Sequence, residues 1–179
     1  MILVTGQPRG GLSLVWRLLK AAGFNLAFEP LNPWNKMPDD WADRFEGAKQ
    51  PWSDYLGDGW KDFDKIVRVR RPCMDTCYSQ WARDSERRDP NVLVARWHML
   101  DDGMDDKIPH AMDLWYEKMC ANPDEVMDEI IQWLGGSGSI TGWGSQDPPE
   151  WFHKDYDASK IHAPATGLWR NEPAWSAYH

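Results

Sequence analysis

The chain is poor in the residues that mark several classes of protein. It has only three cysteines among 179 residues, Cys73, Cys77 and Cys120, too few for a disulfide-stapled fold. No apolar run approaches the length of a membrane span, and the opening MILVTG lacks the successive basic and apolar regions of a signal peptide. We therefore expect a cytoplasmic protein that does not associate with membranes.

Positive charge is also scarce, because 20 lysines and arginines face 28 acidic residues, for a net charge of -8. This balance argues against a nucleic-acid partner, which would require a basic face. It leaves room for one local anion pocket, since arginines gather in RVRRP at 68–72. The length suits a single domain over 1–179, within which the region 136–165, rich in glycine and serine at its start, is expected to be a flexible loop.

Strand and helix patterns alternate along the chain. Short apolar runs predict strands at 1–5, 25–29, 65–72 and 111–117, and helical periodicity predicts helices at 12–22, 73–88, 90–100 and 122–134. The second half of 30–47 is a further candidate helix, and the acidic run DDGMDD at 101–106 is expected to be a solvated turn. Such alternation predicts an α/β fold in which a parallel β-sheet is flanked by helices, with its ligand crevice at the carboxyl ends of the strands.

The first strand is followed by a phosphate-loop pattern that lacks its lysine. Residues 6–13 read G-x-x-x-x-G-L-S, where a nucleoside triphosphatase would have G-x-x-x-x-G-K-S/T. Leu12 replaces the lysine, and Arg9 supplies a cation three residues earlier. A glycine-rich turn before a helix presents backbone N–H groups to an anion. Without the lysine, however, this loop is poorly suited to bind a magnesium-bound triphosphate. A sulfuryl donor fits better, because that group carries one negative charge fewer and is transferred without a metal.

Four segments, in this order, resemble those of the sulfotransferase family. VTGQPRGGLSLVWRLLKAAG at 4–23 is similar to the family's 5′-phosphosulfate loop, and VRVRRPCMDTCYSQW at 67–81 to its 3′-phosphate segment. LWYEKMCANPDEVMDEIIQWLG at 114–135 and GLWRN at 167–171 resemble its Y-E-x-L-x-x-x-P and G-x-W-K/R-N segments. GAKQP at 47–51 stands where members often have a strand ending in lysine. The resemblance implies a three-layer α/β/α fold related to P-loop NTPases.

The resemblance also implies a donor and the residues that hold it. The donor would be 3′-phosphoadenosine 5′-phosphosulfate (PAPS), with adenosine 3′,5′-bisphosphate (PAP) as product and no metal. The 5′-phosphosulfate would lie on Arg9, Gly10, Gly11, Leu12 and Ser13, and the 3′-phosphate on Arg70 and Ser79. Trp169 and Arg170, in the last segment, would lie beside the nucleotide.

The chain departs from the family pattern at two places. Gly10 and Leu12 replace the usual serine and threonine, which removes two hydroxyls from the 5′-phosphate site. The sequence His162-Ala163-Pro164 stands where the family has Arg-Lys-Gly, which removes a clamp on the 3′-phosphate. Backbone amides and Ser13 remain, so we expect weakened donor binding rather than none.

Transfer to an alcohol needs a base that takes its proton. The family uses a histidine or a glutamate after a strand, and Glu29 stands at the second of these positions, although an ordinary loop carboxylate explains it equally well. Lys49 is either a stabiliser of the transferring group or a surface lysine. Trp34, Trp41 and Trp52 are candidate walls of an acceptor site.

The expected activity is therefore PAPS-dependent sulfuryl transfer to a hydroxyl, or less favourably an amine, of a small molecule or carbohydrate. Two alternatives stay open. One is a non-catalytic module that keeps the fold and binds a nucleotide, glycan or protein, and the other is a kinase-like phosphotransferase. The sequence predicts neither the identity of the acceptor nor the oligomeric state.

Overall fold

The computed structural model describes residues 1–31, 39–52, 58–83, 88–136, 168–171 and 173–178. In this part of the chain, five parallel strands form one sheet in the order β2-β3-β1-β4-β5. They are β1 (Ile2–Gly6), β2 (Leu26–Phe28), β3 (Gly47–Lys49), β4 (Lys65–Arg70) and β5 (Met112–Trp115). The predicted parallel α/β sheet is thereby confirmed. The expected flexible region 136–165 lies almost wholly outside the described residues.

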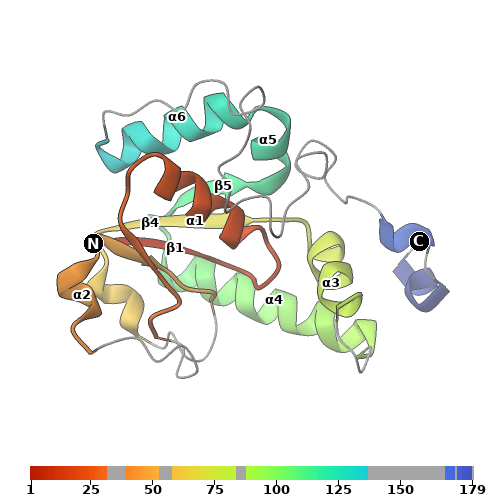
Figure 1. Cartoon of the computed structure of the whole chain (residues 1–179). Coiled ribbons are helices and arrows are strands. Elements are labelled where there is room, and N and C mark those ends of the chain that lie inside the picture. Colours follow the sequence, from red (N-terminus) through yellow and green to blue (C-terminus); the bar gives the residue numbers. More distant parts are fainter. Residues whose placement is uncertain (32–38, 53–57, 84–87, 137–167, 172, 179) are drawn as a thin grey trace.

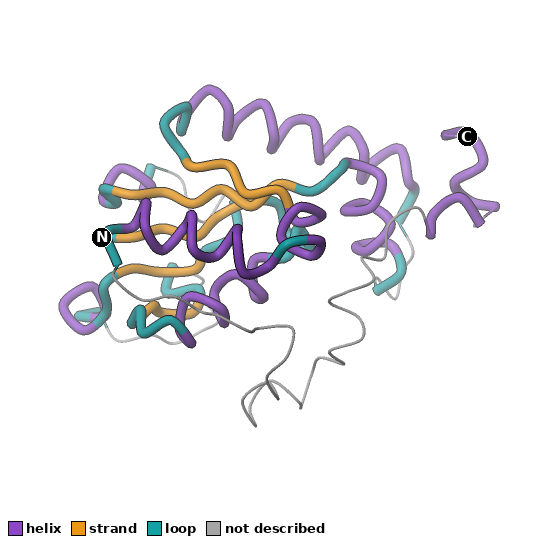
Figure 2. Tube along the Cα trace, turned by 90° about the horizontal axis from the view of Figure 1, so that it is seen from above, coloured by secondary structure: helices purple, strands orange, loops and turns teal. Residues whose placement is uncertain are grey.

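Helices cover both faces of the sheet (Figure 1). One face packs against α1 (Leu12–Ala21), α5 (Tyr116–Ala121) and α6 (Pro123–Leu134), and the other against α4 (Pro90–Lys107). The remaining elements are α2 (Trp41–Arg44), α3 (Cys73–Trp81) and the short 3-10 helices η2 (Gly59–Asp62), η4 (Leu168–Asn171) and η5 (Pro173–Tyr178). Seen from above, the strands lie side by side between these helices (Figure 2).

The burial of β1 and α1 explains why the helix packs against the sheet. All five residues of β1 are buried, as expected for a parallel strand covered on both faces. The apolar side chains of α1 recur three and four residues apart and are buried at Leu14, Val15, Leu18 and Leu19, so one stripe of the helix faces the sheet. The loop between the two elements, residues 7–11, is therefore fixed at both ends.

Three predicted boundaries need correction. The acidic run 101–106 is not a turn, because α4 continues through it to Lys107. The predicted strand 111–117 ends at Trp115, and Tyr116 and Glu117 begin α5 instead. The helix predicted over 73–88 ends at Trp81.

Within the described residues, no helix combines the length and the apolar character that crossing a bilayer requires. The same residues contain no group of three or more His, Cys, Asp or Glu side chains that could hold a metal ion.

Candidate functional site

The loop after β1 is a tight turn with a left-handed arginine. The amide of Gly10 donates to the carbonyl of Gln7 at 2.9 Å, which closes the turn Gln7-Pro8-Arg9-Gly10. Arg9, at the third position, has φ 68, as a type II turn requires there. Non-glycine residues avoid this region of φ, so the surrounding structure must hold Arg9 in place. The Arg9 side chain itself is exposed.

The carbonyl groups of this loop are held from outside by other parts of the fold. Gln80 of α3 donates to the carbonyl of Pro8 at 3.0 Å, and Arg71 donates to that of Arg9 at 3.3 Å. The Gln7 side chain donates in turn to the carbonyl of Trp97 on α4 at 2.8 Å. Because these carbonyls are tied to other parts of the fold and the Gly10 N–H is used inside the turn, the N–H groups offered to a ligand are those from Gly11 onward.

The first turn of α1 adds to this anion-binding character. Gly11 caps the helix with φ 99, no side chain caps its N-terminus, and its first turn holds no acidic residue. The first N–H groups of a helix have no acceptor within the helix, and the helix dipole places partial positive charge there. Leu12 is buried in the core, so it contributes only its backbone, whereas the Ser13 side chain is partly exposed. Residues 7–13 thus have the features of an anion-binding cradle.

Gly10 and Gly11 are required by close approaches. A Cβ atom on Gly10 would lie 2.9 Å from the carbonyl oxygen of Gln7. A Cβ atom on Gly11 would lie 2.3 Å from Cδ2 of Tyr116. The serine that the family has at position 10 would therefore crowd this turn, which explains that departure in physical terms.

Arg71 contacts the loop after β1, whereas the sequence pattern pointed to its neighbour Arg70. Its guanidinium lies 4.9 Å from the ring centroid of Tyr116, its Nε is 3.7 Å from Oε1 of Glu117, and the side chain is 7% exposed. Burial raises the pKa of the Glu117 carboxyl, against the opposing charge of Arg71. Arg68 and Arg70 share one face of β4, whereas Arg71 follows the end of the strand and reaches the loop.

Arg70 lies at the carboxyl end of β4, as predicted, but its guanidinium is held by three carboxylates. It contacts Asp113 at 3.0 Å, Asp101 at 3.2 Å and also Asp105. Burial lowers the pKa of Arg70, but the charges of Asp113 and Asp101 outweigh burial and raise it. Ser79 is partly exposed on α3 and makes no hydrogen bond to Arg70. The role of Arg70 and Ser79 as a 3′-phosphate pair stays a prediction.

Arg68 joins the same network, which explains its position on a buried strand. It donates to Asp113 at 3.0 Å and to Asp105 at 2.7 Å, and its side chain is 5% exposed. Burial raises the pKa of Asp113, but the hydrogen bonds and charge of Arg68 outweigh that effect and lower it. Asp101 and Asp105 come from the acidic run that was expected to face solvent. Arg68 is therefore an ion-paired residue of a buried strand.

Glu29 and Lys49 are brought together at the carboxyl ends of β2 and β3. The Lys49 ammonium and the Glu29 carboxylate form an ion pair, with side chains 4% and 17% exposed. The Lys49 ammonium also lies 4.0 Å from the ring centroid of Phe28. Burial lowers the pKa of Lys49, against the hydrogen bond and charge of Glu29. Lys49 is therefore not a surface lysine.

Backbone conformation also distinguishes two predicted site residues. Glu29 has φ 48 and Arg9 has φ 68, and these two are the non-glycine residues with positive φ in the described part of the chain. Backbone strain of this kind concentrates at functional sites, where surrounding contacts maintain it. The coincidence with two independently predicted positions supports both as site residues.

The C-terminal segment packs against α3. Trp175 of η5 is fully buried beside Trp81 and Tyr78, with ring centroids 6.2 and 6.1 Å away. Arg170, in η4, is exposed. The side chain of Trp169 and the whole segment His162–Pro164 lie outside the described residues.

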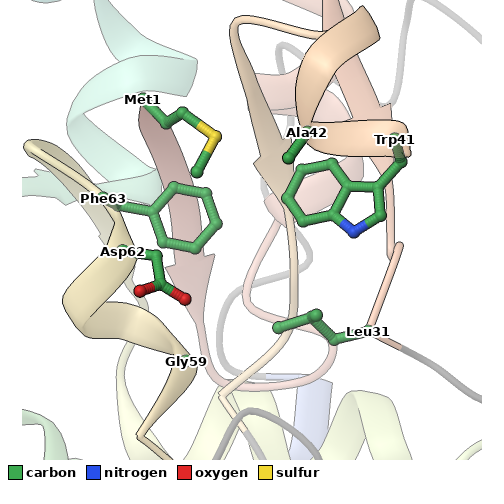
Figure 3. A pocket seen from close by; sticks show the side chains of 7 residues that line it. All are labelled: Met1, Leu31, Trp41, Ala42, Gly59, Asp62 and Phe63. Atoms are coloured by element: carbon green, nitrogen blue, oxygen red, sulfur yellow. The ribbon is translucent and has the colours of Figure 1, made fainter. Parts of the chain in front are cut away.

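A pocket of about 450 Å³ is lined by seven residues, among them Met1, Leu31 and Trp41 (Figure 3). Its walls include Trp41 and Phe63, whose rings stack with centroids 6.4 Å apart. Met1, Trp41 and Phe63 all precede strands, whereas residues 7–11 follow one, so most of this pocket lies toward the amino ends of the sheet. We assign it no part in donor binding. Of the other candidate acceptor walls, Trp52 is buried in the core and Trp34 lies outside the described residues.

Comparison with known proteins supports the fold and not a closer relationship. No protein-family model matches the chain, and no curated protein matches it. Among solved structures, it is similar to the crystal structure of mouse sulfotransferase SULT7A1 complexed with PAP, with a TM-score of 0.53 and 16% sequence identity. The match covers 75% of this chain but only 57% of the mouse protein. The chain has a sulfotransferase-like α/β fold.

Proposed function

We propose that this chain is a PAPS-dependent sulfotransferase that transfers a sulfuryl group to a hydroxyl, or less favourably an amine, of a small molecule or carbohydrate. The observation that carries the proposal is the cradle at residues 7–13. Its carbonyls are tied outward by Arg71 and Gln80, and it leads into an uncapped helix N-terminus without a nucleotide-binding lysine. The similarity to a PAP-bound sulfotransferase supports the same assignment.

Each proposed site residue has a distinct role. Backbone amides of residues 11–13 and the Arg9 guanidinium hold the 5′-phosphosulfate, and Ser79 with Arg70 or the neighbouring Arg71 binds the 3′-phosphate. Glu29 accepts the proton of the acceptor hydroxyl, and Lys49 stabilises the negative charge that develops on the departing phosphate. Trp169 and Arg170 lie beside the nucleotide. PAPS is the donor and PAP the product, and the chain's contribution is positioning and electrostatics.

Calorimetric titration with three nucleotides tests the donor site. Wild type is expected to bind PAP without metal more tightly than adenosine 5′-phosphate, and more tightly than ATP with magnesium. Ser79→Ala should lower the ratio of the affinities for PAP and adenosine 5′-phosphate by about tenfold or more, because it deletes a hydrogen bond to a charged group. Arg9→Ala should weaken the binding of PAP and of adenosine 5′-phosphate by a similar factor, since both carry the 5′-phosphate.

The variants are chosen so that loss of binding is not loss of fold. Arg9 is exposed and Ser79 makes no hydrogen bond to Arg70, so both substitutions should change the stability of the fold little. The matched control is Arg96→Ala, at an exposed arginine of α4. Metal-dependent preference for ATP would support the kinase-like alternative. PAP binding without transfer from PAPS to any hydroxyl or amine acceptor would support the non-catalytic module. If no nucleotide binds, the cradle is not a donor site and the proposal fails.

A further inference from the structure

Two of the three cysteines form a pair on α3. Cys73 and Cys77 are one helical turn apart, and their sulfur atoms lie 3.9 Å from each other. Both are free thiols, as is Cys120, which is buried elsewhere, on α5. The proposed sulfuryl transfer uses none of them. The question is what chemistry a close thiol pair on one helix face supports.

The two thiols have unequal environments. Cys77 is fully buried in a cluster with Trp81, Leu93 and Trp175, whereas Cys73 is partly exposed. Cys73 is also the first residue of a nine-residue helix whose N-terminus has no side-chain cap. A helix N-terminus stabilises a thiolate, so the accessible sulfur is the one better placed to ionise.

The contact between the sulfurs reinforces this inequality. A hydrogen bond from Cys77 lowers the pKa of the Cys73 thiol, against burial and the charge of Asp101, which raise it. The pKa of Cys77 is raised, first by that hydrogen bond and then by burial. The pair therefore consists of one accessible thiol that ionises readily and one protected thiol that keeps its hydrogen.

We propose that Cys73 is a modification site for hydroperoxides and that Cys77 resolves the oxidised form into a reversible disulfide. The Cys73 thiolate attacks the peroxide O–O bond, which forms Cys73 sulfenic acid and releases hydroxide, or alkoxide from an alkyl hydroperoxide. The Cys77 sulfur then attacks the sulfenic sulfur, which forms the S–S bond, and water departs with the Cys77 proton. Two thiols are oxidised, and one peroxide is reduced.

Helix geometry explains why this disulfide is readily reduced. Residues four apart on a helix have Cβ atoms about 5–6 Å apart. A relaxed disulfide needs Cβ atoms at about 3.5–4.5 Å, so the first turn of α3 must tighten when the bond forms. A strained disulfide has a more oxidising potential and returns to thiols easily. The pair is suited to reversible modification and not to a structural cross-link.

Thiol counting and intact mass on the full reduced chain test the proposal. After brief exposure to hydrogen peroxide at neutral pH, titratable thiols should fall from three to one. The monomer should lose the mass of two hydrogen atoms, and dithiothreitol should restore both values. Cys73 should react at least about tenfold faster than Cys120, because Cys120 is buried and its pKa is raised by burial.

Three serine variants separate the roles, with circular dichroism confirming that each is folded. Cys77→Ser should accumulate a Cys73 sulfenic acid that dimedone traps, whereas Cys73→Ser should lose the fast reaction. Cys120→Ser is the matched control and should still form the disulfide. The proposal is overturned if all three thiols survive the exposure, if Cys73 reacts no faster than Cys120, or if the disulfide forms only between two chains.

Discussion

Lys49 and Glu29 form an ion pair across the carboxyl ends of β3 and β2, and the ammonium is the more deeply buried partner, at 4% exposure against 17% for the carboxylate. Unpaired buried charges are strongly destabilising. The two partners are therefore not equivalent. A variant that lacks the glutamate but keeps the lysine has an unpaired charge at the position with less access to water.

We expect Glu29→Gln to destabilise the fold by about 3 kcal/mol and Lys49→Met by clearly less. The double variant should be more stable than Glu29→Gln alone, because it removes the stranded ammonium. Urea unfolding of the wild type and the three variants measures these differences. Equal and additive losses for the two single changes would show that burial of the ammonium does not govern this pair.

Stability should also depend on pH through Lys49. Burial holds the folded-state pKa of Lys49 below its ordinary value of 10.5, so between those two values the unfolded chain binds more protons. The contribution of this residue to stability therefore rises with pH across that window. Unfolding free energies of wild type and Lys49→Met, measured from about pH 8 to pH 10.5, should diverge in favour of wild type. Parallel curves would contradict the lowered pKa.

Gly11 should tolerate a methyl group far less well than Gly23. The two have nearly the same φ, 99 and 98, but a Cβ on Gly11 meets the Tyr116 ring whereas one on Gly23 meets nothing within 4 Å. Gly23→Ala should cost about 1 kcal/mol from the left-handed backbone alone. Gly11→Ala should cost roughly 2 kcal/mol more from the close contact. Thermal unfolding of the two variants compares them, and equal losses would mean that Tyr116 moves aside freely.

Arg70→Glu should unfold the protein more readily than Arg70→Met. The glutamate would stand among Asp101, Asp105 and Asp113, whereas methionine only removes the cation from them. Breaking this network should cost about 3 kcal/mol or more, with the larger loss for glutamate. High salt should recover part of that extra loss, since about 1 M salt shortens screening to about 3 Å. A salt-independent difference between the variants would argue against charge repulsion as its cause.

The sequence predicted the α/β architecture because buried strands and amphipathic helices have strong local patterns. It also placed Lys49 at the end of a strand and Arg9 in a glycine-rich turn. It failed for 101–106, because aspartates normally favour solvent. Here Asp101 and Asp105 lie in a helix and form ion pairs with Arg70 and Arg68 on the strand β4. It pointed to Arg70 and not to Arg71 as the phosphate contact for the same reason. Contacts between residues far apart in sequence decide which of the two guanidinium groups faces the loop.

The loop after β1 is short, yet the groups that hold its carbonyls come from residues 71 and 80, more than 60 positions downstream. Its shape therefore depends on the chain having closed a long connection and docked α3. A fragment that ends before α3 would contain the whole glycine-rich motif and still lack the cradle. Any anion that selects the cradle would thus bind the assembled chain alone and would stabilise it against global unfolding.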